Sequence, residues 1–298
     1  MHANTTYLID ASIYIFRYYF TLPDHWHSDD NYSTSAVYGY TTWLMRFIRS
    51  QRPSFVAACF DESLESCFRN RIYPQYKCSR ALPDAALAFQ LHACKRITEL
   101  FGIPTYASPR FEADDLIGTL AARVQKSKQP CTIVSRDKDL GQLVVDKTMR
   151  LWDFPDGNPM GPREIKQKWG VHPHQVADYL ALVGDPGDDI PGVPNVGAKT
   201  AVALLTAFGS WDRIKHNFEQ VERLPMRGAK TIALRLTEYQ HQVDMAIQLS
   251  RIHLRAQLGR KYSVARKKLR PKILCDYTDY LGFGRRFRTS VANLMALL

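Results

Sequence analysis

Short apolar runs alternate along this chain with helix-like segments, and three of these runs are followed within three residues by an aspartate. The runs occupy residues 6–9, 55–60, 103–106 and 131–134, and the helices between them are expected at 11–20, 35–49, 83–101 and 112–125. Runs of four to six apolar residues are typical of buried strands. Their alternation with helices predicts an α/β fold with a mostly parallel central sheet flanked by helices.

Carboxylates gather where these strands are expected to end. Asp10, Asp61 and Asp137 follow three of the apolar runs. Ligands of open parallel sheets bind beyond the carboxyl ends of the strands, so the acids are expected to share one site. Two further groups extend this pattern, Glu112-Ala-Asp114-Asp115 at the start of a helix and Asp137-Lys-Asp139 after a strand. Helix capping and ordinary turns are the simpler explanations, but three acids in four positions repel one another unless a cation lies between them.

The charge of the chain contrasts with this acidic site. The 298 residues include 40 Lys and Arg and 29 Asp and Glu, a net charge of +11, and residues 251–298 alone hold 12 basic and two acidic side chains. A basic surface favours contact with a phosphate backbone, although a solvated face or an acidic protein partner would explain it equally well. Basic surfaces around an acidic, cation-binding site predict a nuclease.

The organisation of the chain changes after a turn-rich segment at 155–162. We expect a metal-binding α/β core at 1–160, with a basic, aromatic excursion at about 62–82. Residues 161–298 are expected to form a helical DNA-binding region, with helices at 173–183, 197–208, 211–218 and 229–249 and a basic C-terminal segment, packed as one unit with the core. The six cysteines form no C-x-x-C pair, which favours reduced thiols. No membrane span is expected.

The most specific motif is G-D-P-G-D-D-I-P-G-V-P-N-V-G-A-K-T-A at 184–201. Asp185 and Asp188 can face a metal site. The segment from Gly192 to Gly197 predicts a tight hairpin whose backbone N–H groups, at the start of the next helix, suit a phosphate. Lys199 and Thr200 would add a charge and a hydroxyl donor, whereas a plain Gly/Pro turn is the alternative.

Several ordered motifs together resemble the bacterial and phage 5′ nuclease (flap endonuclease) family, which includes the N-terminal 5′ nuclease domain of bacterial DNA polymerase I. They are L-I-D-A-S at 8–12, F-R-Y-Y-F at 16–20, S-A-V-Y-G at 35–39, F-D-E at 60–62, Y-P-Q-Y-K-C-S-R at 73–80, E-A-D-D at 112–115, S-R-D-K-D-L at 135–140 and the motif at 184–201. The resemblance implies a PIN-like core, a helical arch and a helix-hairpin-helix (helix-3-turn-helix) region at 173–209.

The resemblance also implies two metal sites. The first would comprise Asp10, Asp61, Glu112 and Asp114 with neighbouring Asp115, and the second Asp137, Asp139, Asp185 and Asp188. Mg²⁺ suits such all-oxygen sites and Mn²⁺ would substitute for it. The hairpin of this family often binds a monovalent cation, so K⁺ is expected at 192–197.

DNA contacts follow from the same resemblance. Lys77 would stabilise the scissile phosphate, Arg80 would steer phosphates, and Tyr73 or Tyr76 would stack on a base, with packing inside the arch as the equal alternative for the tyrosines. Arg17 and Tyr19 would approach the strand near the cut. In the hairpin, duplex contacts are expected from Gly192, Val193, Val196, Gly197, Lys199 and Thr200.

These expectations combine into a Mg²⁺-dependent 5′-3′ exonuclease or 5′-flap endonuclease that hydrolyses phosphodiesters in DNA with 5′ flaps or 5′ ends. It would act in replication or repair as a cytoplasmic monomer, either as a standalone protein or as an excised domain. Two alternatives stay open: a catalytically weak homologue that only binds flap DNA, and a metal-dependent nuclease directed at RNA.

Overall fold

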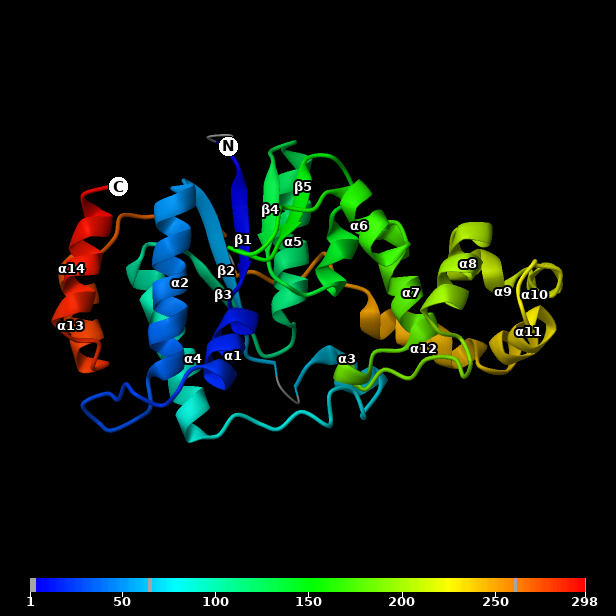
Figure 1. The fold of residues 1–298 in the computed structure, drawn as a ribbon, viewed down its shortest axis with the longest axis horizontal. Helices are drawn as coiled ribbons and strands as arrows, with labels where there is room; N and C mark the ends of the chain where they lie inside the picture. The colour runs from blue at the N-terminus through cyan, green and yellow to red at the C-terminus, as the bar shows by residue number, and fades with distance from the viewer. Residues whose placement is uncertain (1–3, 64–65, 260–261, 298) are drawn as a thin grey trace.

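The computed structural model, which describes residues 4–63, 66–259 and 262–297, contains a five-stranded parallel sheet (Figure 1). The strands are β1 (Thr6–Asp10), β2 (Phe55–Asp61), β3 (Thr105–Ser108), β4 (Cys131–Val134) and β5 (Met149–Trp152). Their order is β3-β2-β1-β4-β5, and all four pairings are parallel. The expected parallel α/β core is therefore confirmed.

Alternating side chains of the strands supply two separate cores. On β1, Tyr7 and Ile9 face one side of the sheet and Leu8 faces the other, which is the period of two that a strand imposes. Helices α1 (Ala11–Thr21), α2 (Ser35–Gln51) and α4 (Ala85–Leu100) cover the first face, and α5 (Ala113–Lys126) covers the second (Figure 1). Because helices cover both faces of the sheet, both sets of alternating strand side chains are buried, which explains why the strands are mainly apolar.

Some predicted boundaries were wrong. Strand β5 was not expected, because the short run M-R-L-W includes Arg150, whose side chain lies at the sheet edge and donates to the Lys147 carbonyl. The helix expected at 229–249 is divided at Tyr239 into α11 (Ala229–Glu238) and α12 (Gln240–Ser250). The helix expected at 211–218 is likewise two short helices, α9 (Trp211–Lys215) and α10 (Phe218–Val221).

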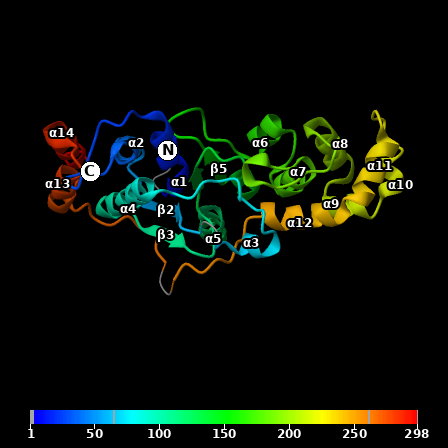
Figure 2. The ribbon, with the colours of Figure 1, turned by 90° about the horizontal axis from the view of Figure 1, so that it is seen from below.

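A helical region extends from the β5 side of the sheet and has a core of its own (Figures 1 and 2). It is formed by α6 (Pro162–Trp169), α7 (Val176–Val183), α8 (Ala198–Phe208) and α9 to α12. Trp211 is fully buried at its centre, where its indole Nε1 donates to Asp244 at 2.7 Å. Short helix α3 (Phe68–Ile72) lies in the predicted excursion and contacts α12.

The chain then returns to the α/β core. Residues 262–270, here called the strap, cross the N-terminal ends of β2 and β3, where the N–H groups of Arg266 and Lys267 donate to the Ser54 and Gly102 carbonyls at 2.9 and 2.7 Å. Gly102 has φ 78°, and a Cβ there would lie 2.1 Å from the Lys267 carbonyl oxygen, so only glycine fits. The strap consequently lies on the α/β core, whereas Arg251, at the start of the basic segment, lies 3.8 Å from Asp178 of α7 in the helical region.

Helices α13 (Pro271–Tyr280) and α14 (Gly284–Met295) follow the strap and pack at the end of the molecule opposite the helical region (Figure 1). Leu274, Phe287 and Val291 complete the core formed by α2 and α4. Among the described helices, none has both the length and the apolar character needed to cross a bilayer.

Candidate active site

Asp10, at the carboxyl end of β1, is the innermost acid of the site. Its carboxylate caps α1 by accepting from the Ile13 N–H at 3.4 Å and accepts a second hydrogen bond from the Ser135 hydroxyl at 2.8 Å. Burial raises the pKa of Asp10 to about 7, and the nearby charges of Asp61 and Asp137 contribute in the same direction. The strand-end position thus places this carboxylate among other acids, as expected.

The acids after β2 and at the start of α5 adjoin Asp10. Asp61 accepts from the Ala113 N–H at 2.7 Å, which joins the end of β2 to the first turn of α5. Burial raises the pKa of Asp114 well above its ordinary value, and Asp137, Asp10 and Asp61 add to the effect through their charges. Asp10, Asp61 and Asp114 of the predicted first group therefore form one electrostatic cluster with Asp137.

The second predicted group adjoins this cluster. Burial raises the pKa of Asp139, and repulsion by Asp137, Asp185 and Asp188 raises it further. The Asp139 N–H donates to Asp137 at 2.9 Å, whereas Asp139 Oδ1 is buried and has no hydrogen-bond partner within the described residues. A buried carboxylate oxygen without a partner is costly, and a cation would remove that cost.

Four basic side chains, Lys77, Arg80, Lys138 and Arg69, partly balance the acids. Lys77 pairs with Glu112 and lies 3.5 Å from Asp188, Arg80 pairs with Asp188, and Lys138 pairs with Asp185 at 3.0 Å. Burial alone would raise the pKa of Glu112, but the charges of Lys77 and Arg69 hold it below its ordinary value. The predicted catalytic residues Lys77 and Arg80 thus do reach the acids. Lys138 was missed, although its place between Asp137 and Asp139 was a sufficient signal.

Tyr76 is not available for base stacking. It is only 3% exposed, and its hydroxyl lies 2.9 Å from Glu112 Oε2 and 3.2 Å from Asp188 Oδ2. The stacking role expected for Tyr76 is therefore wrong in this structure, and the alternative of packing inside the arch describes it. Tyr73 is half-buried against the helical core, with its hydroxyl donating to Gln75 at 2.6 Å.

Asp115 differs from the other predicted acids because a fully buried arginine engages both its oxygens. Arg69 donates to Asp115 from both terminal nitrogens, at 2.7 and 2.8 Å, and its Nε donates to the Leu249 carbonyl at 2.7 Å. Asp115 also accepts from the N–H groups of Glu112 and His253. This network joins α3, α5 and the end of α12, and it leaves Asp115 no free oxygen for a metal. Sequence reasoning missed Arg69.

A cavity of 880 Å³ opens onto Asp61 and Glu112. Lys77 and Arg80 line it on one side, and Tyr19 and Phe20, at the end of α1, line another. Phe20 is 77% exposed. It was not predicted as a site residue, because a phenylalanine in an aromatic-rich helix is expected to pack in the core. Tyr19, which was predicted to contact DNA, therefore lies at the mouth of the site.

Arg17, the other predicted DNA contact of α1, is not among the residues that line the cavity. Its side chain instead pairs with Asp156 at 3.2 Å.

The predicted hairpin joins α7 and α8, and Gly197 lies at the N-cap of α8. Val193 and Val196 are each 3% exposed, and their N–H groups donate to the Leu182 and Val193 carbonyls at 2.9 and 3.0 Å. The side chains and amides of these two valines are therefore not free to bind DNA, which corrects that expectation. Lys199 is exposed and Thr200 is half-buried in the first turn of α8, where backbone N–H groups remain for an anion.

Comparison with known proteins agrees with this geometry. The family model of the 5′-3′ exonuclease N-terminal resolvase-like domain matches residues 5–170, and that of the 5′-3′ exonuclease C-terminal SAM fold matches residues 171–271. The chain belongs to the 5′-3′ exonuclease family. It is a nuclease, because the family resemblance predicted from its motifs extends over most of its length.

Relatives of this exonuclease include both short and long proteins. The 5′-3′ exonuclease of Buchnera aphidicola subsp. Schizaphis graminum is 34% identical over 247 residues, which cover 83% of this chain and 85% of that protein. DNA polymerase I of Bacillus caldotenax is 34% identical over 220 residues, 72% of this chain and 25% of that protein. The T5 D15 protein, crystallised with metal ions, shares the fold with a TM-score of 0.68 at 17% identity, over 98% of this chain and 99% of that one.

The donor set of the exonuclease fits a hard divalent cation. All the clustered side chains offer carboxylate oxygens, the ligands that Mg²⁺ and Mn²⁺ prefer. Among the described residues, no three acidic, His or Cys side chains already converge on one point as a preformed metal site. The ammonium groups of Lys77 and Lys138 instead hold Glu112 and Asp185. A divalent ion would therefore compete with these lysines for the same oxygens.

Proposed function

We propose that this exonuclease hydrolyses phosphodiesters of DNA at 5′ ends and 5′ flaps with the help of two Mg²⁺ ions. The observation that carries the proposal is the gathering of mutually repelling acids from β1, β2, α5, the loop after β4 and the loop before α8 at one end of the sheet, although no three of them yet meet at a single point within the described residues. Like charges in a poorly solvated site repel unless they are protonated or bind cations. Divalent cations supply the charge that such a cluster lacks.

The proposed metal ligands are the predicted acids without Asp115. Asp10, Asp61, Glu112 and Asp114 would hold one ion, and the second group, Asp137, Asp139, Asp185 and Asp188, would hold the other. When bound, such a pair of ions activates a water nucleophile and stabilises the leaving oxygen of a phosphodiester. Asp115 is a positioning residue, since Arg69 holds it and it accepts from the Glu112 N–H at 3.2 Å.

Lys77 and Arg80 are proposed to bind the phosphate next to the cut. Both lie on the segment that closes over the acids, where the Lys77 N–H donates to the Asp188 carbonyl at 3.1 Å. If a phosphate entered the 880 Å³ cavity, its oxygens could replace the carboxylates of Glu112 and Asp188 as the ion-pair partners of Lys77 and Arg80. Tyr76 supports this arrangement by orienting Glu112 and Asp188 through its hydroxyl. Positive charge aimed at the reacting phosphate stabilises the charge that develops during hydrolysis.

The α7–α8 hairpin is proposed to bind the duplex backbone without reading sequence. Gly197 is the N-cap of α8, and Lys199 and Thr200 lie in its first turn, where N–H groups and the lysine charge suit a phosphate. K⁺ at 192–197 has weaker support, because the carbonyl of Gly192 already accepts from Gln242 at 2.9 Å. A loss of duplex affinity when Na⁺ replaces K⁺ at constant ionic strength would support the K⁺ site, and equal affinity would exclude it.

Cleavage of a 5′-labelled flap duplex tests the function. The protein is expected to cut at the flap junction with Mg²⁺ or Mn²⁺, to stop with EDTA, and to lose cleavage while keeping DNA binding when Asp139 is changed to Asn. Asp276→Asn, an exposed acid on α13, is the matched control and should cut normally. Binding without any cleavage by the wild-type protein would identify a DNA-binding homologue. Preferential cutting of the same flap made of RNA would identify an RNA-directed nuclease.

A further inference from the structure

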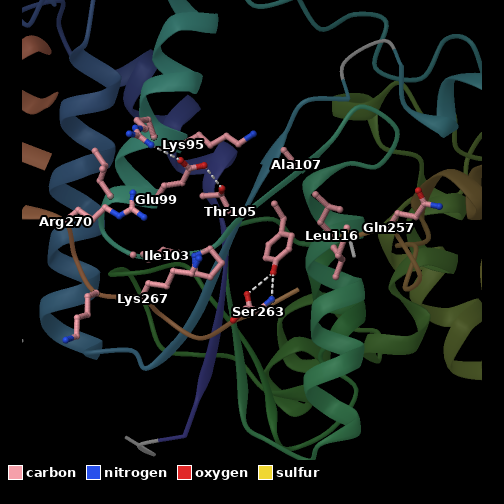
Figure 3. A pocket seen from close by; sticks show the side chains of 18 residues that line it. Lys95, Glu99, Ile103, Thr105, Ala107, Leu116, Gln257, Ser263, Lys267 and Arg270 are labelled. Atoms are coloured by element: carbon pink, nitrogen blue, oxygen red, sulfur yellow. Dashed lines mark hydrogen bonds and ion pairs between the residues drawn. The ribbon is translucent and has the colours of Figure 1, made fainter. Parts of the chain in front are cut away.

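A cleft of 710 Å³ follows the outer edge of β3, which is the sheet edge opposite β5 (Figure 3). Helix α4 lines one side through Lys95 and Glu99, and the strap lines the other through Lys267 and Arg270. The strap crosses the N-terminal ends of β2 and β3, whereas the catalytic acids lie at the carboxyl ends of the strands. The cleft is therefore a separate site.

Among the described residues, the outer edge of β3 has no paired strand along this cleft. The Ala58 N–H donates to the Pro104 carbonyl at 3.0 Å, so the backbone groups of Pro104 and, two residues later, Tyr106 are directed toward β2. Alternate residues of a parallel strand direct their N–H and C=O groups to opposite edges, so those of Thr105 and Ala107 face the cleft. Within the described residues, β3 pairs only with β2. Both residues are half-buried, and an open edge of this kind accepts a further strand.

The cleft combines this edge with an apolar base and a basic rim. Ile103 and Leu116 are buried along its length. On the rim, Lys267, Lys268 and Arg270 are exposed and form no ion pair within the described residues, whereas Lys95 pairs with Glu62 at 2.6 Å. The cations of the active site are engaged by acids, whereas in the part of the chain that the structure describes Lys267, Lys268 and Arg270 have no acidic partner and can meet an acidic ligand.

We propose that this cleft binds an extended acidic segment of a partner protein, which adds to the sheet as a strand beside β3. A peptide offers the N–H and C=O groups that the edge requires, and its alternating side chains would contact the apolar base and the basic rim. A nucleic-acid strand would satisfy the rim charges but has no backbone amides to pair with Thr105 and Ala107. The Tyr106 hydroxyl donates to the Ser263 carbonyl and accepts from the Ser263 N–H, both at 2.8 Å. It is therefore not free to bond a nucleic-acid base.

Fluorescence anisotropy of the full chain with a labelled peptide tests the proposal independently of nuclease activity. The probe is an alternating Asp-Val peptide of about six residues, the usual strand length. It is expected to bind, and the double variant K267E/K268E is expected to weaken binding by at least about tenfold. The matched control R285E/R286E makes the same charge change on exposed residues of α14 and should alter binding by less than about twofold. Arg266 is left intact because its Nε donates to the Phe101 carbonyl at 3.2 Å.

Two methylated peptides separate strand pairing from simple charge attraction. One carries N-methyl groups on every Asp and the other on every Val, so each blocks one edge of the extended peptide. Strand addition predicts that one of the two binds about tenfold more weakly and that the other binds like the parent. No binding of the parent peptide, or equal binding of all three, overturns the proposal. It is also overturned if oligo-dT binds more tightly than the peptide and loses binding in K267E/K268E, because the cleft would then be a nucleic-acid surface.

Discussion

The arch segment at 76–80 and the hairpin at 192–200 were both predicted from sequence to contact DNA, yet the structure orients them differently. In the arch, Lys77 and Arg80 face inward and pair with the clustered acids. In the hairpin, Lys199 is exposed and has no ion-pair partner within the described ranges. Cations coupled to the acids should affect chemistry, whereas an isolated exposed cation should affect only affinity. Substitutions in each segment should therefore separate an effect on the chemical step from an effect on DNA affinity.

The largest effect is expected at the acids that the arch covers. Asp114→Asn should slow flap cleavage on the order of a thousandfold or more, because it removes a proposed metal ligand, while binding of the duplex persists. Single-turnover cleavage with excess protein, compared with anisotropy in Ca²⁺, measures the two quantities. Asp276→Asn is the control on an exposed helix face. If the cleavage rate and the duplex affinity fell by the same factor, Asp114 would have no role in the chemical step.

A large effect on stability is expected at Arg69, which connects the base of the arch to the acids and to α12. Arg69→Met leaves Asp115 buried without its counter-ion and should lower the free energy of unfolding by about 3 kcal/mol, as broken buried pairs do. Urea unfolding measures the loss. Arg235→Met removes the exposed pair with Glu238 and should cost less than about 1 kcal/mol. Similar losses in both variants would show that the buried network adds nothing beyond a surface pair.

Lys77→Met should slow cleavage by about a hundredfold, because it removes positive charge next to the reacting phosphate. Duplex affinity should fall only a few-fold, since Lys77 is mostly buried beside Glu112. The ratio of the two effects, from single-turnover rates and anisotropy, is the decisive quantity. Equal losses would make Lys77 an ordinary anchor and would remove the contrast between arch and hairpin.

The smallest effect is expected in the hairpin. Lys199→Met should weaken duplex binding a few-fold and reduce the slope of log affinity against log salt by about one, because one phosphate contact disappears. Cleavage at saturating protein should be unchanged. Titrations at several salt concentrations measure the slope, with Lys230→Met on α11 as an exposed control. An unchanged slope would place the duplex elsewhere.

Local periodicity and strand-end position were sufficient to predict the sheet and its acidic end. Asp10 and Asp61 follow apolar strands directly, so parallel pairing alone brings them together. The role of Asp115 could not be predicted in this way. Its partner Arg69 lies 46 residues away in the sequence, and only the folded chain buries the two side chains against each other. Tyr76 has the same limit: the motif located it in the arch, but only long-range packing against Glu112 and Asp188 reveals which way its ring faces.

The return of the chain through the strap has a consequence for synthesis on the ribosome. Leu274, Phe287 and Val291 complete the core beneath α2 and α4, although they follow the entire helical region in the chain. Part of the apolar surface formed by the first hundred or so residues therefore stays open to solvent while the helical region is translated. Nascent chains in that interval are expected to bind chaperones and to reach their native state only after α13 and α14 have emerged.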